Sequence, residues 1–124
     1  MAKALVVDDS RAIRMLLVRT LKQIGYEVQE AANGREALAI IEAGNSGVNL
    51  VLADWNMPEM NGLELLKKVR QNPALSSLAV VMVTTETEIE QIAEAMQAGA
   101  NEYVMKPFTQ DILVEKLELA GIRP

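Results

Sequence analysis

Short runs of apolar residues alternate with longer amphipathic segments along this chain of 124 residues. The short runs, such as Ala4-Leu5-Val6-Val7, have the length and composition typical of buried strands. The longer segments repeat apolar residues at intervals that place them on one face of a helix. The pattern predicts strands at residues 4–7, 26–31, 50–53, 78–83 and 103–105, each followed by a helix.

Turn and capping residues punctuate the same pattern at the expected helix ends. Ser, Thr and Asn favour the start of a helix, whereas Gly and Pro favour its end. The expected starts include Ser10, Asn33-Gly34, Gly62 and Thr109, and the expected ends are Gly25, Gly44, Asn72-Pro73 and Gly99. Residues 121–124 are expected to form a frayed tail.

The strand-helix alternation predicts the fold class. The run at 26–31 is weaker, because Val28 lies there among polar neighbours, but the other strand runs are continuously apolar. Both faces of the sheet are therefore expected to be covered by helices. A helical connection after each strand suits parallel pairing. The predicted fold is α/β, a doubly wound five-stranded parallel sheet with five helices on its two faces, in one domain spanning residues 1–124. Ligands of such sheets bind beyond the carboxyl ends of the strands.

Composition excludes several function classes. The chain has no Cys and no His, which rules out disulfides, thiolate catalysis, Ser-His-Asp hydrolysis, His-ligated metals and a phosphohistidine role. Its net charge of −5 argues against a nucleic-acid or anionic-membrane surface. No apolar run approaches a spanning helix, and no export signal is visible. We therefore expect a cytoplasmic protein that binds neither nucleic acid nor membrane. We also expect it to be a monomer.

Aspartate is scarce and unevenly placed. The sequence has thirteen Glu but only four Asp. Asp is unfavourable inside helices, so it is expected at caps, turns or sites. Asp111 lies at a predicted helix start, but Asp8, Asp9 and Asp54 directly follow predicted strands. These three carboxylates therefore need a separate explanation.

The carboxyl ends of parallel strands share one edge, so these carboxylates should meet Thr84 and Lys106, which follow the fourth and fifth strands. Clustered carboxylates repel, so a proton or a cation must be bound. Mg²⁺ suits such oxygen ligands and attracts a phosphoryl group. Lys106 and Thr84 can contact its oxygens, while Asp54 can act as a nucleophile that forms an acyl phosphate. The alternative is that each residue is an ordinary cap or turn.

The chain resembles the receiver domains of two-component response regulators over its whole length. The matching residues, in order, are the acidic pair Asp8-Asp9, then Asp54, Thr84 and Lys106-Pro107. The loop Asp54-Trp55-Asn56-Met57-Pro58, followed by Met60, Asn61 and Gly62, is most similar to the chemotaxis members. Tyr103 matches the family's switch aromatic. The resemblance implies a flavodoxin-like sheet with strand order 2-1-3-4-5.

The resemblance also implies residue roles. Asp54 is the phosphoacceptor, and Thr84 and Lys106 bind the phosphoryl oxygens. Mg²⁺ is held directly by Asp9, Asp54 and the backbone carbonyl of Asn56, and through water by Asp8. The Lys106–Pro107 bond is expected to be cis. The expected switch and partner surface comprises Tyr103, Ile92, Met105 and Lys116.

The implied function is that of a single-domain response regulator with no output domain. A histidine kinase donates the phosphoryl group, and the phosphorylated form binds a protein target, with the flagellar motor switch of chemotaxis as the expected one. A phosphatase is a further expected partner. The protein is expected to be no enzyme beyond its own phosphotransfer and dephosphorylation.

Three alternatives and two departures stay open. The first alternative is a stand-alone receiver in another phosphorelay. A haloacid-dehalogenase-type phosphohydrolase needs a second Asp where Asn56 stands, and a flavodoxin-like cofactor module would have its phosphate repelled by Asp8-Asp9. Thr85 stands where many receivers carry Ala or Gly, and its methyl is expected to narrow access to Asp54. The connection 45–49 has no assigned pairing.

Overall fold

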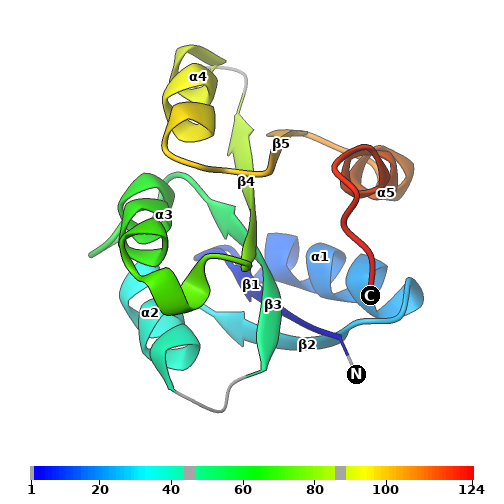
Figure 1. The fold of residues 1–124 in the computed structure, drawn as a ribbon. Helices are drawn as coiled ribbons and strands as arrows, with labels where there is room; N and C mark the ends of the chain where they lie inside the picture. The colour runs from blue at the N-terminus through cyan, green and yellow to red at the C-terminus, as the bar shows by residue number, and fades with distance from the viewer. Residues whose placement is uncertain (1, 44–46, 86–88) are drawn as a thin grey trace.

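The computed structural model describes residues 2–43, 47–85 and 89–124 and confirms the alternation of strands and helices (Figure 1). The elements in chain order are β1 (Lys3–Val7), α1 (Arg11–Gln23), β2 (Glu27–Ala31), α2 (Gly34–Glu42), β3 (Val48–Asp54), α3 (Gly62–Gln71), η1 (Pro73–Leu75), β4 (Ala79–Thr85), α4 (Ile89–Gln97), β5 (Glu102–Lys106) and α5 (Gln110–Leu119). The sequence pattern does not predict the short 3₁₀ helix η1. Asn72 caps it, and Pro73 is its first residue.

All strands pair in parallel in the order β2-β1-β3-β4-β5, which confirms the doubly wound sheet. Alternate strand residues feed two cores. One core lies between the sheet and α2, α3 and α4, and includes Leu5, Val51 and Met82. The other lies between the sheet and α1 and α5, and includes Val6 and Val81. Figure 1 shows these two helical layers on either side of the sheet.

Three strands run further than predicted. Asp54 is the last residue of β3, Thr84 and Thr85 end β4, and Lys106 ends β5. The reason is that these polar residues still pair with the neighbouring strand: Asp54 lies opposite Val83, and Thr85 lies opposite Lys106. Asp54, Thr84 and Lys106 therefore stand on hydrogen-bonded strands rather than on the loops after them, whereas Asp8 and Asp9 follow the end of β1.

The expected helix starts are observed as side-chain caps. A side-chain oxygen of each capping residue accepts a hydrogen bond from a backbone N–H in the first turn. The third helix is capped by Asn61, whose partner Glu64 completes a capping box. The other described caps are Ser10, Asn33 and Thr109.

The prediction of a frayed tail is wrong for the residues that follow α5. Gly121, with φ of +72°, donates to the Glu118 carbonyl, and Ile122 donates to the Leu117 carbonyl at 2.9 Å. Ile122 then packs against the core that includes Val6. This is the hydrogen-bonded helix ending that Gly provides because it adopts positive φ easily.

Gly25 and Gly99 end α1 and α4 in the same way, as predicted. The predicted end of the second helix, Gly44, lies outside the described residues. Within the parts of the chain that the structure describes, no helix is long and apolar enough to cross a membrane.

Candidate functional site

The carboxyl edge of the sheet gathers charged residues from three strands. The Lys106 ammonium lies 3.1 Å from Asp8 Oδ2 and 3.1 Å from Asp54 Oδ1. Oxygens of Asp8, Asp9 and Asp54 all lie within 4.8 Å of one another. Asp8 and Asp54 are buried, whereas Asp9 is exposed. The predicted clustering of these residues is therefore observed.

The backbone around Asp8 is held by a residue that sequence analysis missed. Arg14 donates from Nη1 to the Asp8 carbonyl at 2.6 Å and from Nε to Glu30 at 3.1 Å. The Asp8 carboxylate also accepts a hydrogen bond from the Ser10 N–H at 2.8 Å. Arg14 thus ties the end of β1 to β2. Its partner is a backbone carbonyl, which no sequence pattern marks.

The segment after Asp54 is fixed by backbone contacts. The Trp55 N–H donates to the Val83 carbonyl at 3.2 Å, and the Gly62 N–H donates to the Trp55 carbonyl at 2.9 Å. A side chain at Gly62 would collide with the Asp54 carbonyl. Trp55 is only 5% exposed and belongs to the core, so it packs this loop against the interior of the protein.

The loop beyond Trp55 contains a tight turn. The Met60 N–H donates to the Pro58 carbonyl at 2.7 Å, and Glu59 between them has φ of +66°, a left-handed conformation uncommon for a side-chain-bearing residue. The Met60 carbonyl in turn accepts from the Gly34 N–H at 3.3 Å. This loop is thereby attached to the first turn of α2.

The electrostatics of the site favour a cation. Burial, and then the charge of Asp8, raise the pKa of Asp54, although Lys106 and the Asn56 backbone N–H oppose this. Burial lowers the pKa of Lys106, but the carboxylates of Asp54 and Asp8 outweigh burial and leave it raised. Lys106 is therefore charged at neutral pH and offsets part of the carboxylate repulsion.

The donor set fits a magnesium ion. All three side chains offer carboxylate oxygens, and one of them, Asp9, is open to water. Mg²⁺ prefers oxygen ligands and retains several waters, so a half-open group of this kind suits it. The Asn56 carbonyl, expected from the resemblance as the third direct protein ligand after Asp9 and Asp54, belongs to an exposed residue two positions after Asp54.

Thr84 and Thr85 lie beside this group. Thr84 is 1% exposed and follows Val83, the residue that pairs with Asp54. Its hydroxyl is 3.5 Å from the Thr85 carbonyl, too long for a strong bond. Thr85 is half-buried and lies opposite Lys106. The Lys106–Pro107 bond is cis, as expected.

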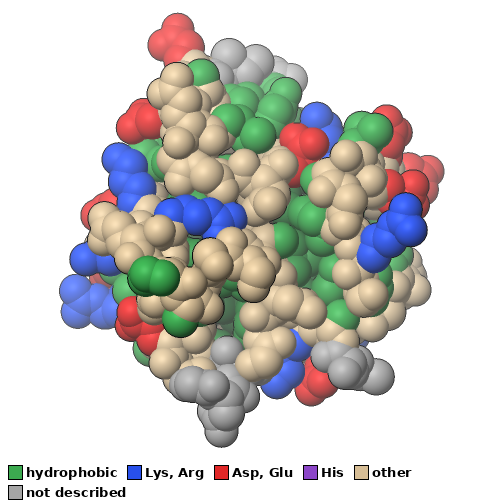
Figure 2. Space-filling model, in the orientation of Figure 1, with side chains coloured by type: hydrophobic (Ala, Val, Ile, Leu, Met, Phe, Trp, Pro, Cys, Tyr) green, Lys and Arg blue, Asp and Glu red, His purple; other side chains and the backbone are tan. Residues whose placement is uncertain are grey.

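The expected switch surface is partly assembled. Lys116 Nζ lies 4.4 Å from the centre of the Tyr103 ring and 4.0 Å from Glu102. Met105 is two residues after Tyr103 and so faces the same side of β5. Ile92, on α4, is half-buried, and none of the described contacts joins it to the other three. Figure 2 shows hydrophobic side chains reaching the surface beside α4.

Residues 4–118 match the family model of the response regulator receiver domain. The chemotaxis protein CheY1 of Helicobacter pylori is 46% identical over 118 residues, which cover 94% of each chain. The CheY homolog of Campylobacter jejuni is 46% identical over 117 residues, which cover 94% of this chain and 89% of that one.

Solved structures are similar over nearly the whole chain. The chemotaxis response regulator CheY4 of Vibrio cholerae has a TM-score of 0.87 and 40% identity, covering 97% of this chain and 98% of that one. The receiver domain of NtrX from Brucella abortus has a TM-score of 0.84 and 33% identity, covering 94% and 96%.

Proposed function

Because this chain belongs to the family of response regulator receiver domains, we propose that it is a switch that accepts a phosphoryl group on Asp54 from a histidine kinase. The observation that carries the proposal is the contact of one ammonium, Lys106, with both Asp8 and Asp54 at 3.1 Å, beside the exposed Asp9. A buried acid with a fixed cation and room for a metal is suited to phosphoryl transfer.

The chemistry follows from these groups. A carboxylate oxygen of Asp54 attacks the phosphorus of a phosphohistidine, the phosphorus–nitrogen bond breaks, and the departing imidazole takes up a proton. An acyl phosphate remains on Asp54. Lys106 and the Thr84 hydroxyl contact the phosphoryl oxygens, where charge is greatest.

We assign the metal to Asp8, Asp9, Asp54 and the Asn56 carbonyl. When bound there, Mg²⁺ would neutralise part of the negative charge of the phosphoryl group. The residues of this chain orient the nucleophile: Trp55 and Gly62 fix the backbone after it, and Arg14 fixes the end of β1. No separate substrate is turned over, so the protein acts as a switch rather than as an enzyme in the ordinary sense.

The proposal is tested with Mg²⁺ and acetyl phosphate, a small phosphodonor. Intact-mass measurement should show one added phosphoryl group, labile to hydroxylamine. The group should be absent in Asp54→Asn and present in Asp111→Asn, a matched control at an exposed position. Phosphate found on Thr84 or Thr85 would contradict the mechanism.

The names of the relatives favour chemotaxis as the pathway, with a flagellar motor protein as target and a phosphatase as a further partner. A pull-down with the Asp54-phosphorylated form tests this assignment. Selective capture of a motor switch protein supports it, whereas capture of a phosphotransfer protein of another pathway indicates a stand-alone receiver elsewhere. We place this activity in the cytoplasm.

A further inference from the structure

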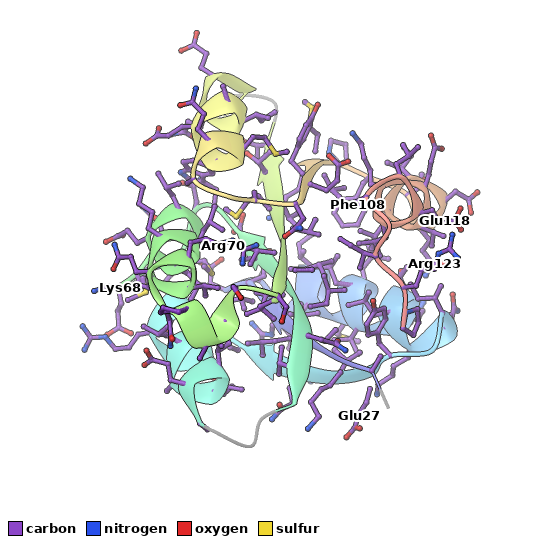
Figure 3. The ribbon with its side chains drawn as sticks, in the orientation of Figure 1. Glu27, Lys68, Arg70, Phe108, Glu118 and Arg123 are labelled. Atoms are coloured by element: carbon purple, nitrogen blue, oxygen red, sulfur yellow. The ribbon has the colours of Figure 1, made fainter. Side chains whose placement is uncertain are left out.

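Arg70 joins the far end of α4 to the rest of the molecule. It lies in the last turn of α3, and its guanidinium donates to the Gly99 carbonyl at 2.9 Å, the Leu78 carbonyl at 2.8 Å and Asn101 Oδ1 at 2.9 Å. These acceptors belong to two stretches of chain: Leu78 directly precedes β4, and Gly99 and Asn101 lie in the turn between α4 and β5. In Figure 3, Arg70 reaches from α3 toward β4.

Asn101 completes the connection. Its Oδ1 also accepts from the Val80 N–H at 2.9 Å, and its own N–H donates to the Val80 carbonyl at 2.8 Å. The turn between α4 and β5 is therefore bonded to β4 by backbone and side chain at once. We call Arg70, Gly99 and Asn101 the α4 anchor.

Close packing between Arg70 and Gly99 holds the α4 anchor in one position. A Cβ on Gly99 would lie within 3.0 to 3.2 Å of three Arg70 atoms, so the two residues are in close contact. Burial lowers the pKa of Arg70, but a guanidinium stays charged at neutral pH. The charge lies at the carboxyl end of α4, where it interacts favourably with the helix dipole.

Apart from the α4 anchor, few of the described α4 side chains are buried and attach the helix to the rest of the molecule. Among the α4 side chains that the structure describes, Ala95 is the one that is fully buried, and Met96 is 41% exposed. Glu94 makes an exposed ion pair with Lys67 at 4.0 Å, a kind of contact that contributes little. Burying a methyl group stabilises far less than burying a leucine. The Arg70 contacts therefore hold the turn that directly follows α4, where three directed hydrogen bonds meet.

We propose that the α4 anchor is a pivot, with Arg70 as a positioning residue for signal transmission. This rests on the proposed function. When Asp54 is phosphorylated, rearrangement at Thr84 and Thr85 reaches α4 at its amino end. Because the carboxyl end is held at Gly99 and Asn101, the helix tilts about that end. Without the anchor the whole helix and the start of β5 shift together. The movement is then no longer confined to the amino end of α4, and it also displaces Tyr103.

The test is amide hydrogen exchange with and without Mg²⁺ and acetyl phosphate, after intact mass has shown phosphorylation. In the wild type, exchange should change over residues 89–93 and stay constant at residues 99–101. In Arg70→Met, amides 99–101 should exchange about tenfold faster before phosphorylation, the equivalent of one lost hydrogen bond. The phosphorylation-dependent change should then extend along all of α4 and into Glu102 and Tyr103.

Two further variants and a control sharpen the result. Arg70→Lys keeps the positive charge but loses the three directed donors of the guanidinium. Its exchange pattern should therefore lie between those of the wild type and Arg70→Met. Asn101→Ala removes a single acceptor and serves if Arg70→Met folds poorly. Lys67→Met breaks the exposed pair between the same two helices and should behave as the wild type.

Two outcomes overturn the pivot alone. One is equal movement of residues 89–93 and 99–101 in the phosphorylated wild type. The other is an Arg70→Met protein that is less stable to urea yet keeps the wild-type distribution of exchange changes, which would make Arg70 merely structural. A wild type that gains no phosphoryl mass overturns the proposed function, and the pivot with it.

Discussion

Lys106 and Asp8 are 98 positions apart in the sequence, yet their charged atoms lie 3.1 Å apart. The same ammonium is 3.1 Å from Asp54. One lysine thus bridges two buried carboxylates that would otherwise repel each other. The acidic group is held together by a cation of the chain itself, and this arrangement makes the site sensitive to changes at position 106.

Lys106→Met should destabilise the protein at neutral pH without divalent cation by about 2 kcal/mol, because two buried carboxylates lose their common partner. Mg²⁺ should restore much of the loss and bind more tightly than to the wild type. Urea unfolding with EDTA or Mg²⁺ measures both effects. Lys22→Met, at an exposed position, is the control; a loss no larger than in that control contradicts the prediction.

Asp54→Asn should stabilise the protein at neutral pH. The pKa of Asp54 is raised by burial and by Asp8, so the folded state binds this proton more tightly than the unfolded chain does. The contribution of Asp54 to the stability of the wild type is then fully present below the ordinary carboxyl pKa of about 4. It is lost as the pH rises through the raised pKa of the folded state.

The gain in Asp54→Asn should therefore be on the order of 1 kcal/mol at pH 7 and vanish below about pH 4. Urea midpoints across this range in EDTA measure it. Asp54→Ala should show the same pH profile at a lower level of stability. A stability difference that does not change with pH would show that the charge of Asp54 is not the cause.

Mg²⁺ should alter Trp55 fluorescence saturably, since the indole is buried directly after the proposed ligand Asp54. Asp9→Asn should weaken the affinity about tenfold by removing one charged oxygen ligand. Glu59→Gln, an exposed acid in the neighbouring loop, should leave the titration unchanged. The metal assignment fails if calorimetry detects no heat and fluorescence no change.

Gly62→Ala should destabilise the protein, although alanine normally stabilises a helix by about 1 kcal/mol relative to glycine. The added methyl would meet the Asp54 carbonyl and the Met82 side chain, 2.7 Å from its terminal carbon. We expect a net loss of about 2 kcal/mol in urea unfolding. An increase in stability would mean that the two backbones separate easily.

Much of the fold is predictable because every strand except β2 contains an uninterrupted apolar run closed by a polar residue. The hydrophobic pattern does not determine the strand order, which follows instead from the resemblance to receiver domains. Position at a strand end also locates Asp8, Asp54 and Lys106 correctly, since parallel strands bring their carboxyl ends together. The exact strand ends are missed, because polar side chains at the edge do not prevent backbone pairing.

The residues that the sequence does not predict are two arginines whose hydrogen-bond partners include backbone carbonyls. Arg14 and Arg70 resemble ordinary surface charges on amphipathic helices, and their acceptors are fixed only when the strands are placed. The docked tail is missed for a different reason. Gly121 followed by Ile122 repeats the pattern of Gly25-Tyr26, which correctly marks the end of the first helix.

The docking of the last residues has a practical consequence. Pro124 lies 3.4 Å from where a side chain on Gly25 would begin, and the Ala2 carbonyl accepts from the Glu27 N–H, so both described ends of the chain lie at the amino edge of the sheet (Figure 1). Asp54 faces the opposite edge. A fluorophore, an affinity handle or a surface tether at either end will leave the proposed phosphoacceptor open, and a short linker between the ends offers a route to circular permutation.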